Sequence, residues 1–486
     1  MKPNLIQFLH HDKLITIDFG QVAFRPSTTV LNYLRMQPGY KGTKEGCAEG
    51  DCGACTVVIA SVDEDNELVY QAIDSCLLFL PALHGKQLIT VENLAIRQGS
   101  NLQLHPVQTA MIEHHGSQCG FCTPGFVMAL FALYKNDAIP NKDYICDNLA
   151  GNLCRCTGYE PILEAASACC NARKPDQFSD SKKETIERLK AIKSSTSKVS
   201  LQTSVQSYFL PSTLEQAIAL RTAHPDATVI NGATDTAIRQ NKTWEYPAKI
   251  IDLSAIEELK VIEKRNRFTF LGSGVTIEKF REWASNYYKP LLPMLDVFAS
   301  IQIRNVATIG GNLSTASPIG DLIPLMIALK ARLKLAGSQG QRWVEVEDYI
   351  TGYRKNSLLP DELLIGIGLQ DQSDGVLIQT AKVSTRRDLD ISTVNIAIRL
   401  RKDNHKKVEE VILIYGGMAA SVKRAINTEK FILGKTWSIE TIEQALPYIE
   451  ADFTPISDAR SGKEYRMYVA RNLLKKMYIQ SLSNPV

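Results

Sequence analysis

The first part of the chain alternates apolar and polar residues over short segments. "LITIDF", "CTVVIA" and "LVYQAI" each follow a period of two, and turns containing glycine or proline separate them. Such alternation is typical of half-buried β-strands. Residues 1–92 are therefore predicted to form a small β-rich domain.

The pattern changes to helical spacing in the next segment. "HPVQTAMIEHHG", "TPGFVMALFALYKN" and "CTGYEPILEAASACCNA" carry apolar residues at the intervals of a helix face. In the middle segment, Thr123 is predicted to be the N-cap, with Pro124 at the first helical position. We expect residues 93–170 to form a compact helical domain.

The remaining chain divides into a linker and two further domains. Residues 171–203 are rich in lysine and serine, which predicts a solvated linker with one exposed helix at "KKETIERLKAI". Between 204 and 375, segments such as "YFLPSTLEQAIAL" and "ATVINGATDTAI" alternate helix and strand, as in an α/β domain. In 376–486, strands such as "VNIAIRL" precede helices such as "IETIEQALPYI". The chain is predicted to be an α+β multidomain protein.

Length and composition are those of an ordinary globular protein. A chain of 486 residues exceeds one domain, and 44% hydrophobic with 22% charged residues is unexceptional. The net charge of +3 gives no indication of nucleic-acid binding. The N-terminus lacks the apolar stretch of a secretory signal, and no segment approaches the length of a membrane span. We expect a cytoplasmic protein that binds neither nucleic acid nor membrane.

The cysteines change this picture, because all eleven lie before residue 171. In "GCAEGDCGACTVV", Cys47, Cys52 and Cys55 have the spacing C-x4-C-x2-C, and Cys76 follows in "AIDSCLLFL". This is the spacing of plant-type [2Fe–2S] ferredoxins. The glycine-rich loop can wrap round a small cluster and direct amides at its sulfurs. A structural zinc site is the alternative, although zinc sites favour two close pairs.

A second group of four cysteines follows. Cys119 and Cys122 lie in "GSQCGFCTPG", and Cys154 and Cys156 lie in "GNLCRCTGY". Each pair precedes a predicted helix start, where the helix dipole favours anionic thiolates. Taken alone, this group is compatible with zinc or with an iron–sulfur cluster.

Two glycine-containing stretches are candidates for binding a pyrophosphate. "TVINGATDTAI" (228–238) contains Gly232, and "FASIQIRNVATIGGNLSTASPIGD" (298–321) contains Gly310 and Gly311. Neither is the G-x-G-x-x-G fingerprint of dinucleotide-binding folds. Their amides and the neighbouring hydroxyls of Thr234, Thr308 and Thr315 could bind phosphate. Taken alone, a simple glycine turn between strand and helix is the commoner explanation.

The motifs together resemble a known family. "GCAEGDCGACTVV", "LHPVQ", "GSQCGFCTPGFVM" and "GNLCRCTGY" are similar to the N-terminal iron–sulfur region of the xanthine dehydrogenase/aldehyde oxidase family of molybdenum hydroxylases. The resemblance implies a β-grasp ferredoxin-like domain followed by a helical domain. It also implies that each group of four cysteines holds one [2Fe–2S] cluster. Cys146, Cys169 and Cys170 match no ligand and are expected to be ordinary, part-buried cysteines.

The same resemblance implies an FAD site in the two glycine-containing stretches. One segment would line the pyrophosphate and ribityl chain: Val229, Ile230, Asn231, Gly232, Ala233, Thr234, Asp235 and Thr236. The second stretch would contact the cofactor through Thr308, Gly310, Gly311, Asn312, Thr315 and Asp321. Phe298 and Leu364 would flank the flavin ring, and Lys382 would lie close to the cofactor. For Asp321, a helix N-cap is a second expectation.

Three short segments resemble xanthine dehydrogenases more than aldehyde oxidases. These are "GYRKN" (352–356), "STRRDLDI" (384–391) and "YGGMAA" (415–420). In the dehydrogenases a charged loop equivalent to Arg386–Asp390 lies near the flavin and affects the access of NAD. The loop of this chain is less acidic than that of the animal enzymes. The resemblance therefore implies NAD as acceptor less strongly than it implies FAD.

The resemblance ends after the flavin domain, whereas the animal enzymes continue into a molybdopterin domain. It implies the small subunit of a split enzyme, with molybdopterin on a separate large subunit in an α2β2 assembly. Electrons from hypoxanthine or xanthine would pass through the Cys119 group and the Cys47 group to FAD and then NAD. No residue of this chain is then expected to act as a general acid or base.

Two other functions stay open at this point. The chain could serve an aldehyde- or N-heterocycle-oxidising molybdenum hydroxylase with an acceptor other than NAD, because substrate identity would reside in the partner. It could instead be a non-enzymatic module whose cysteines bind structural zinc.

Overall fold

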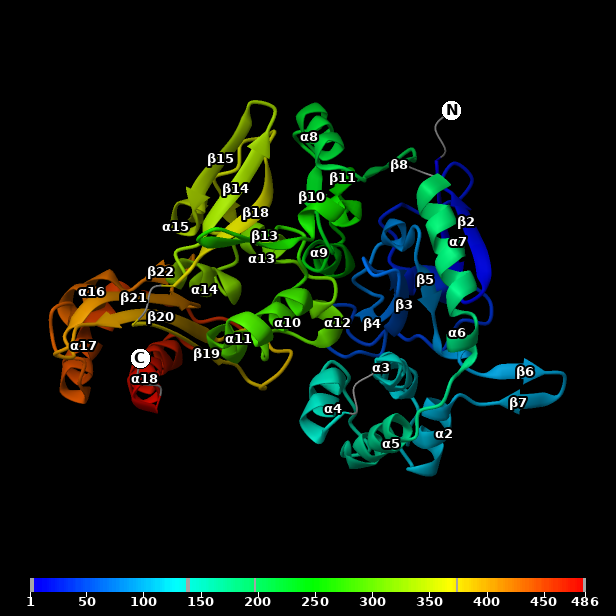
Figure 1. Ribbon diagram of the computed structural model, residues 1–486, viewed down its shortest axis with the longest axis horizontal. Coiled ribbons are helices and arrows are strands. Elements are labelled where there is room, and N and C mark those ends of the chain that lie inside the picture. The colour runs from blue at the N-terminus through cyan, green and yellow to red at the C-terminus, as the bar shows by residue number, and fades with distance from the viewer. Residues whose placement is uncertain (1–3, 137–139, 196–197, 373–374, 484–486) are drawn as a thin grey trace. The chain divides into compact units, whose positions relative to one another are not determined.

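The computed structural model describes residues 4–136, 140–195, 198–372 and 375–483. They form two compact units that are interleaved in sequence. The first unit comprises Met1–Leu220, Asp226–Ile256 and Ser300–Ala307. The second unit comprises Arg221–Pro225, Glu257–Ala299 and Thr308–Val486. Figure 1 shows the elements of both.

The chain begins with a five-stranded mixed sheet in the first unit. The strand order is β2 (Lys13–Asp18), β1 (Leu5–His10), β5 (Gln87–Ile89), β3 (Thr56–Val62) and β4 (Leu68–Asp74). β1 and β5 run parallel, and the other neighbours are antiparallel. Helix α1 (Val30–Met36) starts at Thr29, whose side chain accepts a hydrogen bond from the Asn32 amide. This arrangement agrees with the expected β-grasp domain.

Four helices follow the sheet and confirm the helical segments expected from the sequence. They are α2 (Pro106–Glu113), α3 (Thr123–Lys135), α4 (Lys142–Leu149) and α5 (Glu160–Asn171). A short hairpin, β6 (Ile96–Gln98) with β7 (Asn101–Gln103), precedes them. The predicted N-cap of α3 was wrong by one residue, because Thr123 is the first helical residue and Cys122 is the cap. The Thr123 hydroxyl is hydrogen-bonded to Ser117 Oγ at 2.7 Å instead.

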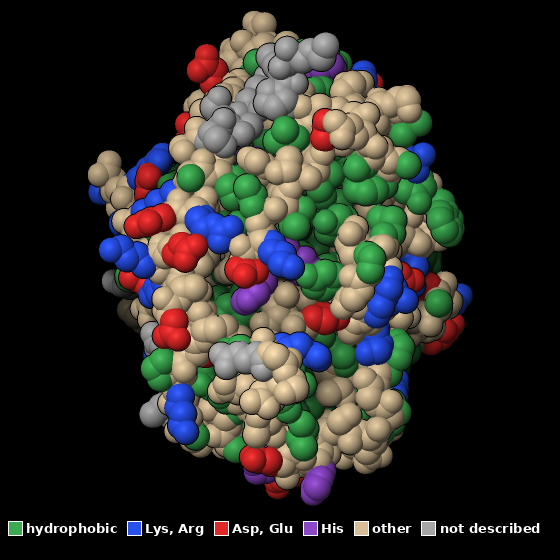
Figure 2. Space-filling view, turned by 90° about the vertical axis from the view of Figure 1, so that its right-hand side faces the viewer, with side chains coloured by type: hydrophobic (Ala, Val, Ile, Leu, Met, Phe, Trp, Pro, Cys, Tyr) green, Lys and Arg blue, Asp and Glu red, His purple; other side chains and the backbone are tan. Residues whose placement is uncertain are grey.

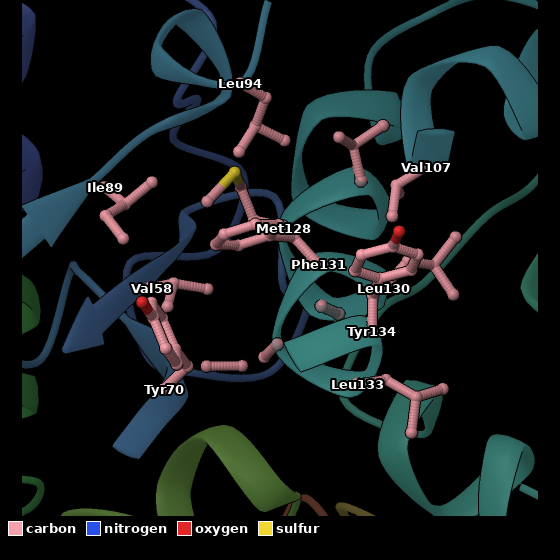
Figure 3. Close-up of a cluster of buried hydrophobic side chains, with 14 of the residues drawn as sticks. Val58, Tyr70, Ile89, Leu94, Val107, Met128, Leu130, Phe131, Leu133 and Tyr134 are labelled. Carbon is pink, nitrogen blue, oxygen red and sulfur yellow. The ribbon is translucent and has the colours of Figure 1, made fainter. Parts of the chain in front are cut away.

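The sheet and the helices share one hydrophobic core. Helix α3 packs on β3, so that Phe131 and Met128 lie among Val58, Tyr70 and Ile89 of the sheet side (Figure 3). These side chains are all buried. Because α3 is covered on several sides, its sequence is almost uniformly apolar and lacks a clear polar face. The two cysteine-bearing domains are therefore packed as one body.

The segment expected to be a solvated linker is folded against this body. It contains α6 (Gln177–Asp180) and α7 (Lys182–Ser195), and α7 packs on β1 and β3. Phe178, Leu189 and Ile192 are buried in the shared core. The lysines that suggested a tether lie on the outer side of an amphipathic helix, whose few apolar residues suffice to fix it.

A buried ion pair network fixes the start of the same segment. Asp176 accepts hydrogen bonds from His105 Nε2 at 3.0 Å and from Lys135 Nζ at 2.8 Å. Burial alone would raise the pKa of Asp176, but these hydrogen bonds and the Lys135 charge hold it below its usual range. His105 and Lys135 belong to the helical region, so the Asp176 carboxylate fixes the start of the following segment to that region.

The first unit also contains the beginning of the α/β region. A four-stranded sheet has the order β10 (Thr228–Ile230), β11 (Lys249–Asp252), β9 (Ser207–Pro211) and β8 (Lys198–Gln202). Helices α8 (Leu214–Ala223) and α9 (Thr236–Thr243) flank β10 in sequence. Helix α12 (Ile301–Arg304) arrives from much later in the chain and packs on β4 and α4.

The second unit is built on two antiparallel sheets. The first has the order β12 (Ile262–Arg265), β13 (Phe268–Gly272), β18 (Leu363–Gln370), β14 (Arg332–Gly337) and β15 (Gly340–Glu345). The second has the order β19 (Val376–Val383), β20 (Val394–Lys402), β21 (Val408–Gly416) and β22 (Lys423–Arg424). A small pair, β16 (Ile350–Gly352) and β17 (Lys355–Asn356), lies in sequence between β15 and β18 of the first sheet.

Helices complete the second unit. Those of its first part are α10 (Ile277–Tyr287), α11 (Leu292–Leu295), α13 (Ile309–Thr315), α14 (Leu322–Ala328) and α15 (Val346–Tyr349). The last sheet is covered by α16 (Ile426–Ile432), α17 (Ile439–Asp452) and α18 (Lys463–Ser483), which bury a core around Ile396, Leu413 and Leu474. Strands followed by helices are the α+β pattern expected for this region.

No helix among the residues described combines the length and apolar character needed to cross a bilayer. On the face shown in Figure 2, basic and acidic side chains are intermixed and do not form a field of one sign. This is consistent with the small net charge of the sequence.

Arg466 should anchor α18 to the last sheet. Its buried guanidinium donates to the carbonyls of Thr393 and Gly417 and to both carboxylate oxygens of Asp458, at 2.9 and 2.8 Å. Arg466→Met should lower the free energy of unfolding by about 3 kcal/mol, because it leaves the buried Thr393 carbonyl without this donor and removes the ion pair with the part-exposed Asp458. Urea denaturation followed by circular dichroism measures the change.

Arg471→Met on the same helix is the matched control. Its exposed ion pair with Glu450, at 2.8 Å, should contribute no more than about 0.5 kcal/mol. Equal effects of the two substitutions would contradict the anchoring role of Arg466.

Candidate functional site

The first group of cysteines lies at one end of the β1–β5 sheet. Cys47 and Cys52 lie in the loop before β3, Cys55 is the residue before that strand, and Cys76 follows β4. The four thiols associate in two pairs. Cys55 Sγ lies 3.4 Å from Cys76 Sγ, and the Cys47 and Cys52 thiols are hydrogen-bonded to each other. The four cysteines that the sequence spacing grouped together thus lie with their sulfurs in two pairs.

The loop directs backbone amides at its sulfur atoms. Cys47 Sγ accepts hydrogen bonds from the amides of Asp51 at 3.2 Å and Glu49 at 3.4 Å. Together with the Cys52 thiol they lower the pKa of Cys47 to about 6, against the effect of burial. A Cβ atom on Gly46 would lie 2.8 Å from Cys52 Sγ, so only glycine fits there. The loop therefore favours a thiolate, the form that binds iron.

Asp74 borders this group at the end of β4. Its Oδ1 lies 3.4 Å from Cys55 Sγ, and its Oδ2 is buried with no hydrogen-bond partner among the described residues. Burial raises the pKa of Asp74 to about 8, which favours a neutral carboxyl beside the sulfur. Sequence analysis did not identify this residue, because a single aspartate at a strand end carries no distinct signal.

The second group forms two pairs as well. Cys119 is hydrogen-bonded to Cys156, and Cys122 is hydrogen-bonded to Cys154. Cys154 Sγ accepts from the Thr157 hydroxyl at 3.2 Å and from the amides of Cys156 and Thr157 at 3.4 Å. Although burial acts in the opposite direction, these donors lower the pKa of Cys154 to about 7.

The arrangement of the thiols in pairs bears on whether they would hold zinc or a [2Fe–2S] cluster. A structural zinc ion needs its ligands arranged around one point. A [2Fe–2S] cluster has two irons that are each bound by two thiolates, so two pairs of sulfurs suit it. The amide donors and the absence of room for a Cβ at Gly46 also fit a cluster.

The other three cysteines lie apart from these groups. Cys169 and Cys170 are buried, with their sulfurs 4.0 Å apart. Cys146 is exposed, so the expectation that it is part-buried was wrong. It lies on α4, which presents its other side to the core through Ile145 and Leu149.

Helix α9 connects the first cysteine group to the predicted flavin loop. The Asn241 side-chain amide donates to the carbonyls of Cys76 at 2.9 Å and Ala48 at 3.0 Å. Ala233 and Ala237 pack in the same core as Cys55 and Cys76. Asn241 was missed by sequence reasoning, because its partners are backbone groups far away in the chain.

The predicted flavin loop Val229–Thr236 is the turn between β10 and α9. Gly232 and Ala233 both have left-handed backbone angles, with φ of +86° and +61°. A Cβ on Gly232 would lie 1.9 Å from the Val306 carbonyl oxygen, so this position requires glycine. Successive residues of unusual φ make the backbone concave, which is the shape that receives a phosphate.

Of the second predicted flavin segment, the part from Thr308 to Asp321 lies in the second unit, around α13. Gly310 is in close backbone contact with Ser273, to whose carbonyl its amide donates at 2.9 Å. Asn312 Oδ1 and Ser273 Oγ are buried and have no hydrogen-bond partner among the described residues. Unsatisfied buried polar atoms suggest a missing ligand. Asn312 was predicted to bind the cofactor, whereas Ser273 is a candidate that the sequence did not suggest.

The two threonines of this segment are partly engaged with the helix itself. Thr308 is the N-cap of α13 and accepts from the Gly311 amide at 3.0 Å. The Thr315 hydroxyl donates to the Gly311 carbonyl at 2.8 Å. The Thr315 hydroxyl can therefore offer a ligand only the lone pairs of its oxygen.

Asp321 and Lys382 bind each other inside the second unit. Asp321 Oδ2 accepts from Lys382 Nζ at 2.9 Å, and its Oδ1 accepts from Ser392 Oγ and from Asn395 Nδ2 at 2.7 Å. Lys382 Nζ also donates to the Val297 carbonyl at 3.1 Å. Asp321 occupies the N-cap position of α14, as expected, but its side chain makes no capping hydrogen bond. The buried pair is well satisfied.

The two residues expected to flank the flavin ring are buried, and the charged loop nearby is closed on itself. Phe298 and Leu364 are 9% and 5% exposed. Arg386 pairs with Asp390 through its guanidinium and its backbone amide. Leu389 is buried, with φ of +69°, and its amide donates to Ala299. The Arg386–Asp390 loop is therefore ordered by its own charges.

Family models match three stretches of the chain. Residues 90–167 match a "[2Fe-2S] binding domain", and residues 197–369 match the "FAD binding domain in molybdopterin dehydrogenase". Residues 379–481 match the "CO dehydrogenase flavoprotein C-terminal domain". The chain belongs to the molybdenum hydroxylase family. It contains iron–sulfur-binding and FAD-binding domains in the order that the sequence motifs indicated.

Curated relatives carry the likeness over almost the whole chain. Xanthine dehydrogenase of Emericella nidulans is 32% identical over 94% of this chain, and xanthine dehydrogenase/oxidase of Rattus norvegicus is 32% identical over 94%. The chain spans only 37% and 38% of the length of these two relatives.

Solved structures of the family share the fold over part of the chain. Reconstituted CO dehydrogenase from Oligotropha carboxidovorans is 25% identical with a TM-score of 0.53, covering 57% of this chain and 96% of that one. Quinoline 2-oxidoreductase from Pseudomonas putida 86 is 22% identical with a TM-score of 0.54, covering 58% and 99%. The second likeness concerns the fold alone.

Lys44 should tune the reduction potential of a cluster bound by the second group. Its ammonium lies 5.8 Å from the Phe121 ring centre and interacts electrostatically with the Cys122 thiol. A nearby positive charge stabilises the reduced, more negative cluster. Lys44→Met should therefore lower the midpoint potential of that cluster, on the order of 50 mV.

Redox titration followed by electron paramagnetic resonance (EPR) measures this shift. Lys44→Arg keeps the charge and is the control, with an expected potential close to that of the parent chain. If Met and Arg at this position gave the same potential, the charge of Lys44 would have no effect on the cluster.

Proposed function

We propose that this chain is the electron-transfer subunit of a xanthine dehydrogenase. It would hold two [2Fe–2S] clusters and FAD, and deliver electrons from a molybdenum-binding partner to NAD. The observation that carries this proposal is that three candidate sites lie within one compact unit: the Cys119 group, the Cys47 group and the loop Val229–Thr236.

The pairing of the thiols supports the proposed cysteine ligands. Cys47, Cys52, Cys55 and Cys76 would hold one cluster, and Cys119, Cys122, Cys154 and Cys156 would hold the other. The amides around Cys47 and Cys154 stabilise the thiolate form and reduce the negative charge that the sulfurs present. When bound, the clusters and FAD supply the one- and two-electron chemistry. This chain contributes distance, orientation and exclusion of water, and no general acid or base.

The residues proposed to contact FAD lie in two separate stretches of the sequence. One is the Val229–Thr236 loop, whose Gly232 adopts a conformation that favours phosphate contact by backbone amides. The other includes Asn312, which together with Ser273 has a buried oxygen without a partner among the described residues. Lys382 is held by Asp321 at the carbonyl of Val297, next to Phe298.

The similarity to xanthine dehydrogenases supports the choice of substrate and acceptor. Relatives of that name match 93% to 98% of the chain at 29% to 32% identity. The segments "GYRKN" and "YGGMAA" agree with this assignment. We therefore propose hypoxanthine and xanthine as substrates of the complete enzyme and NAD as its acceptor, in the cytoplasm.

Membership of the molybdenum hydroxylase family supports a molybdenum-binding partner. The FAD-binding stretch of this chain matches the model of the "FAD binding domain in molybdopterin dehydrogenase". We propose that the molybdopterin-binding portion resides on a separate large subunit, and that the two chains form an α2β2 assembly. The domains of this chain would be 1–92, 93–170, 204–375 and 376–486, with the folded segment 171–203 between the second and third.

Anaerobic titration of the purified chain with NADH tests the acceptor. Loss of both the flavin absorbance and the iron–sulfur absorbance is expected, because a hydride delivered to FAD would be shared with the clusters. If dithionite bleached the protein and NADH did not, the acceptor would not be NAD, and a molybdenum hydroxylase with another acceptor would replace the proposal.

Cys122→Ser tests the second cluster. The iron content should fall from about four to about two atoms per chain, because one of two [2Fe–2S] clusters is lost. With the partner subunit, turnover from xanthine to NAD should collapse, while reduction of a dye by NADH at the flavin should persist. Cys146→Ser, a change at an exposed cysteine on α4, is the control and should retain iron and turnover. Normal xanthine turnover in Cys122→Ser would rule out Cys122 as a ligand.

A further inference from the structure

A short segment of the predicted flavin region is buried among the iron–sulfur domains. Residues Ser300–Ala307 belong to the first unit, although the chain on either side belongs to the second. Gln302 and Arg304 are 0% and 1% exposed. The sequence analysis assigned 298–321 to the flavin site as a whole, and this part of it has a different location.

The side chains of this segment bind both iron–sulfur domains. Arg304 Nη2 donates to both carboxylate oxygens of Asp147 at 3.1 Å, on α4 of the helical domain. Asn305 Nδ2 donates to the Ala72 carbonyl at 2.8 Å, on β4 of the sheet domain. Gln302 Nε2 donates to Asn152 Oδ1 at 2.7 Å. Hydrogen bonds between buried side chains, such as that of Gln302 with Asn152, make the structure around them more rigid.

Asn152 in turn connects the two cysteine groups. Its Nδ2 donates to the Gly53 carbonyl at 3.0 Å and lies 3.2 Å from Thr56 Oγ1. Gly53 follows Cys52 of the first group, and Asn152 lies two residues before Cys154 of the second. Asn152 is 3% exposed, so these hydrogen bonds are protected from water.

The adjacent residue makes the most direct bonded link between the groups. The Leu153 amide donates to the Cys52 carbonyl at 3.0 Å. One hydrogen bond therefore joins the backbone of Cys52 to the backbone that carries Cys154. Electron transfer through a protein weakens steeply with the length and looseness of the connecting path. A buried path of covalent bonds with one hydrogen bond is short and well ordered.

Tight packing around the hydrogen bond between Leu153 and Cys52 restricts movement of the two cysteine loops. Gly53 has φ of +67°, and a Cβ there would lie 2.4 Å from Asn152 Nδ2 and from the Gly151 carbonyl oxygen. A Cβ on Gly151 would lie 2.1 Å from Gln302 Oε1, and one on Gly125 would lie 2.2 Å from the Gly53 carbonyl oxygen. Three glycines thus allow the two loops and Gln302 to approach within backbone contact.

We propose that Asn152 is a positioning residue for electron transfer between the two clusters. Held by Gln302, it fixes the loop of the first group against that of the second, so that the Leu153 amide stays on the Cys52 carbonyl. One electron leaves one cluster and enters the other along this link, and no bond is formed or broken. The inference rests on the proposed function, because it requires both cysteine groups to hold clusters.

The test separates transfer between clusters from transfer into the first cluster. The flavin of the anaerobic holoprotein is reduced by light with EDTA as electron donor, and samples are freeze-quenched and followed by EPR. In Asn152→Leu, which matches the shape of asparagine without its hydrogen bonds, iron content should be unchanged. Reduction of the Cys47-group cluster should keep its rate, and reduction of the Cys119-group cluster should become slower.

Two further variants keep the test decisive. Gln302→Met removes only the bond to Asn152 and should also slow the second step, and it serves if Asn152→Leu fails to fold. Asn148→Leu is the matched control: Asn148 is buried on the same stretch of chain, but its amide donates to the Tyr144 carbonyl within α4. This control should leave both rates unchanged.

Each outcome bears on a different statement. Equal rates of the second step in the parent chain, Asn152→Leu and Gln302→Met would overturn the positioning role. Equal slowing of both steps would mean a general loosening, and would overturn it too. If the parent chain showed a single iron–sulfur signal, the proposed function would fail, and the role of Asn152 with it.

Discussion

The close contact of two backbone loops at Gly53 is the constraint on which the iron–sulfur half of this protein depends. Two groups of thiolates must be held near each other, yet each must keep its own set of amide donors. The contact satisfies both needs, because the Gly53 carbonyl accepts from Asn152 while the Leu153 amide donates to Cys52. Any Cβ at Gly53 would separate the loops.

The shared hydrophobic core supports this contact from behind. Because α3 packs directly on β3, the two domains cannot shift relative to each other without exposing Phe131 and its neighbours. Burial of large aromatic side chains contributes on the order of 2 kcal/mol each, so sliding is strongly opposed. The buried Asp176 network and α7 hold the following segment on the same body. Electron transfer over a fixed distance needs this kind of rigidity.

In the second unit, the buried charged groups expected to lie near a flavin are paired with one another. Asp321 distributes its two oxygens among Lys382, Ser392 and Asn395, so neither the carboxylate nor the ammonium is left without a partner. The loop Arg386–Asp390 is likewise closed by its own ion pair. By contrast, the buried Asn312 Oδ1 and Ser273 Oγ have no hydrogen-bond partner among the described residues, which is expected of groups that would bind a ligand.

The sequence by itself determined the cysteine groups, the main helices and strands, and the family, because these depend on local spacing and periodicity. It could not show that 171–203 packs on the sheet domain, that Asp321 makes no capping hydrogen bond, or that Gln302 lies beside Asn152. Those facts depend on contacts between residues far apart in the chain, 150 positions in the case of Gln302 and Asn152, and such contacts leave no periodic trace in a single sequence. Only the tertiary structure could bring the segment at Gln302 back to the cysteine loops, because burial of its polar side chains requires partners from both domains.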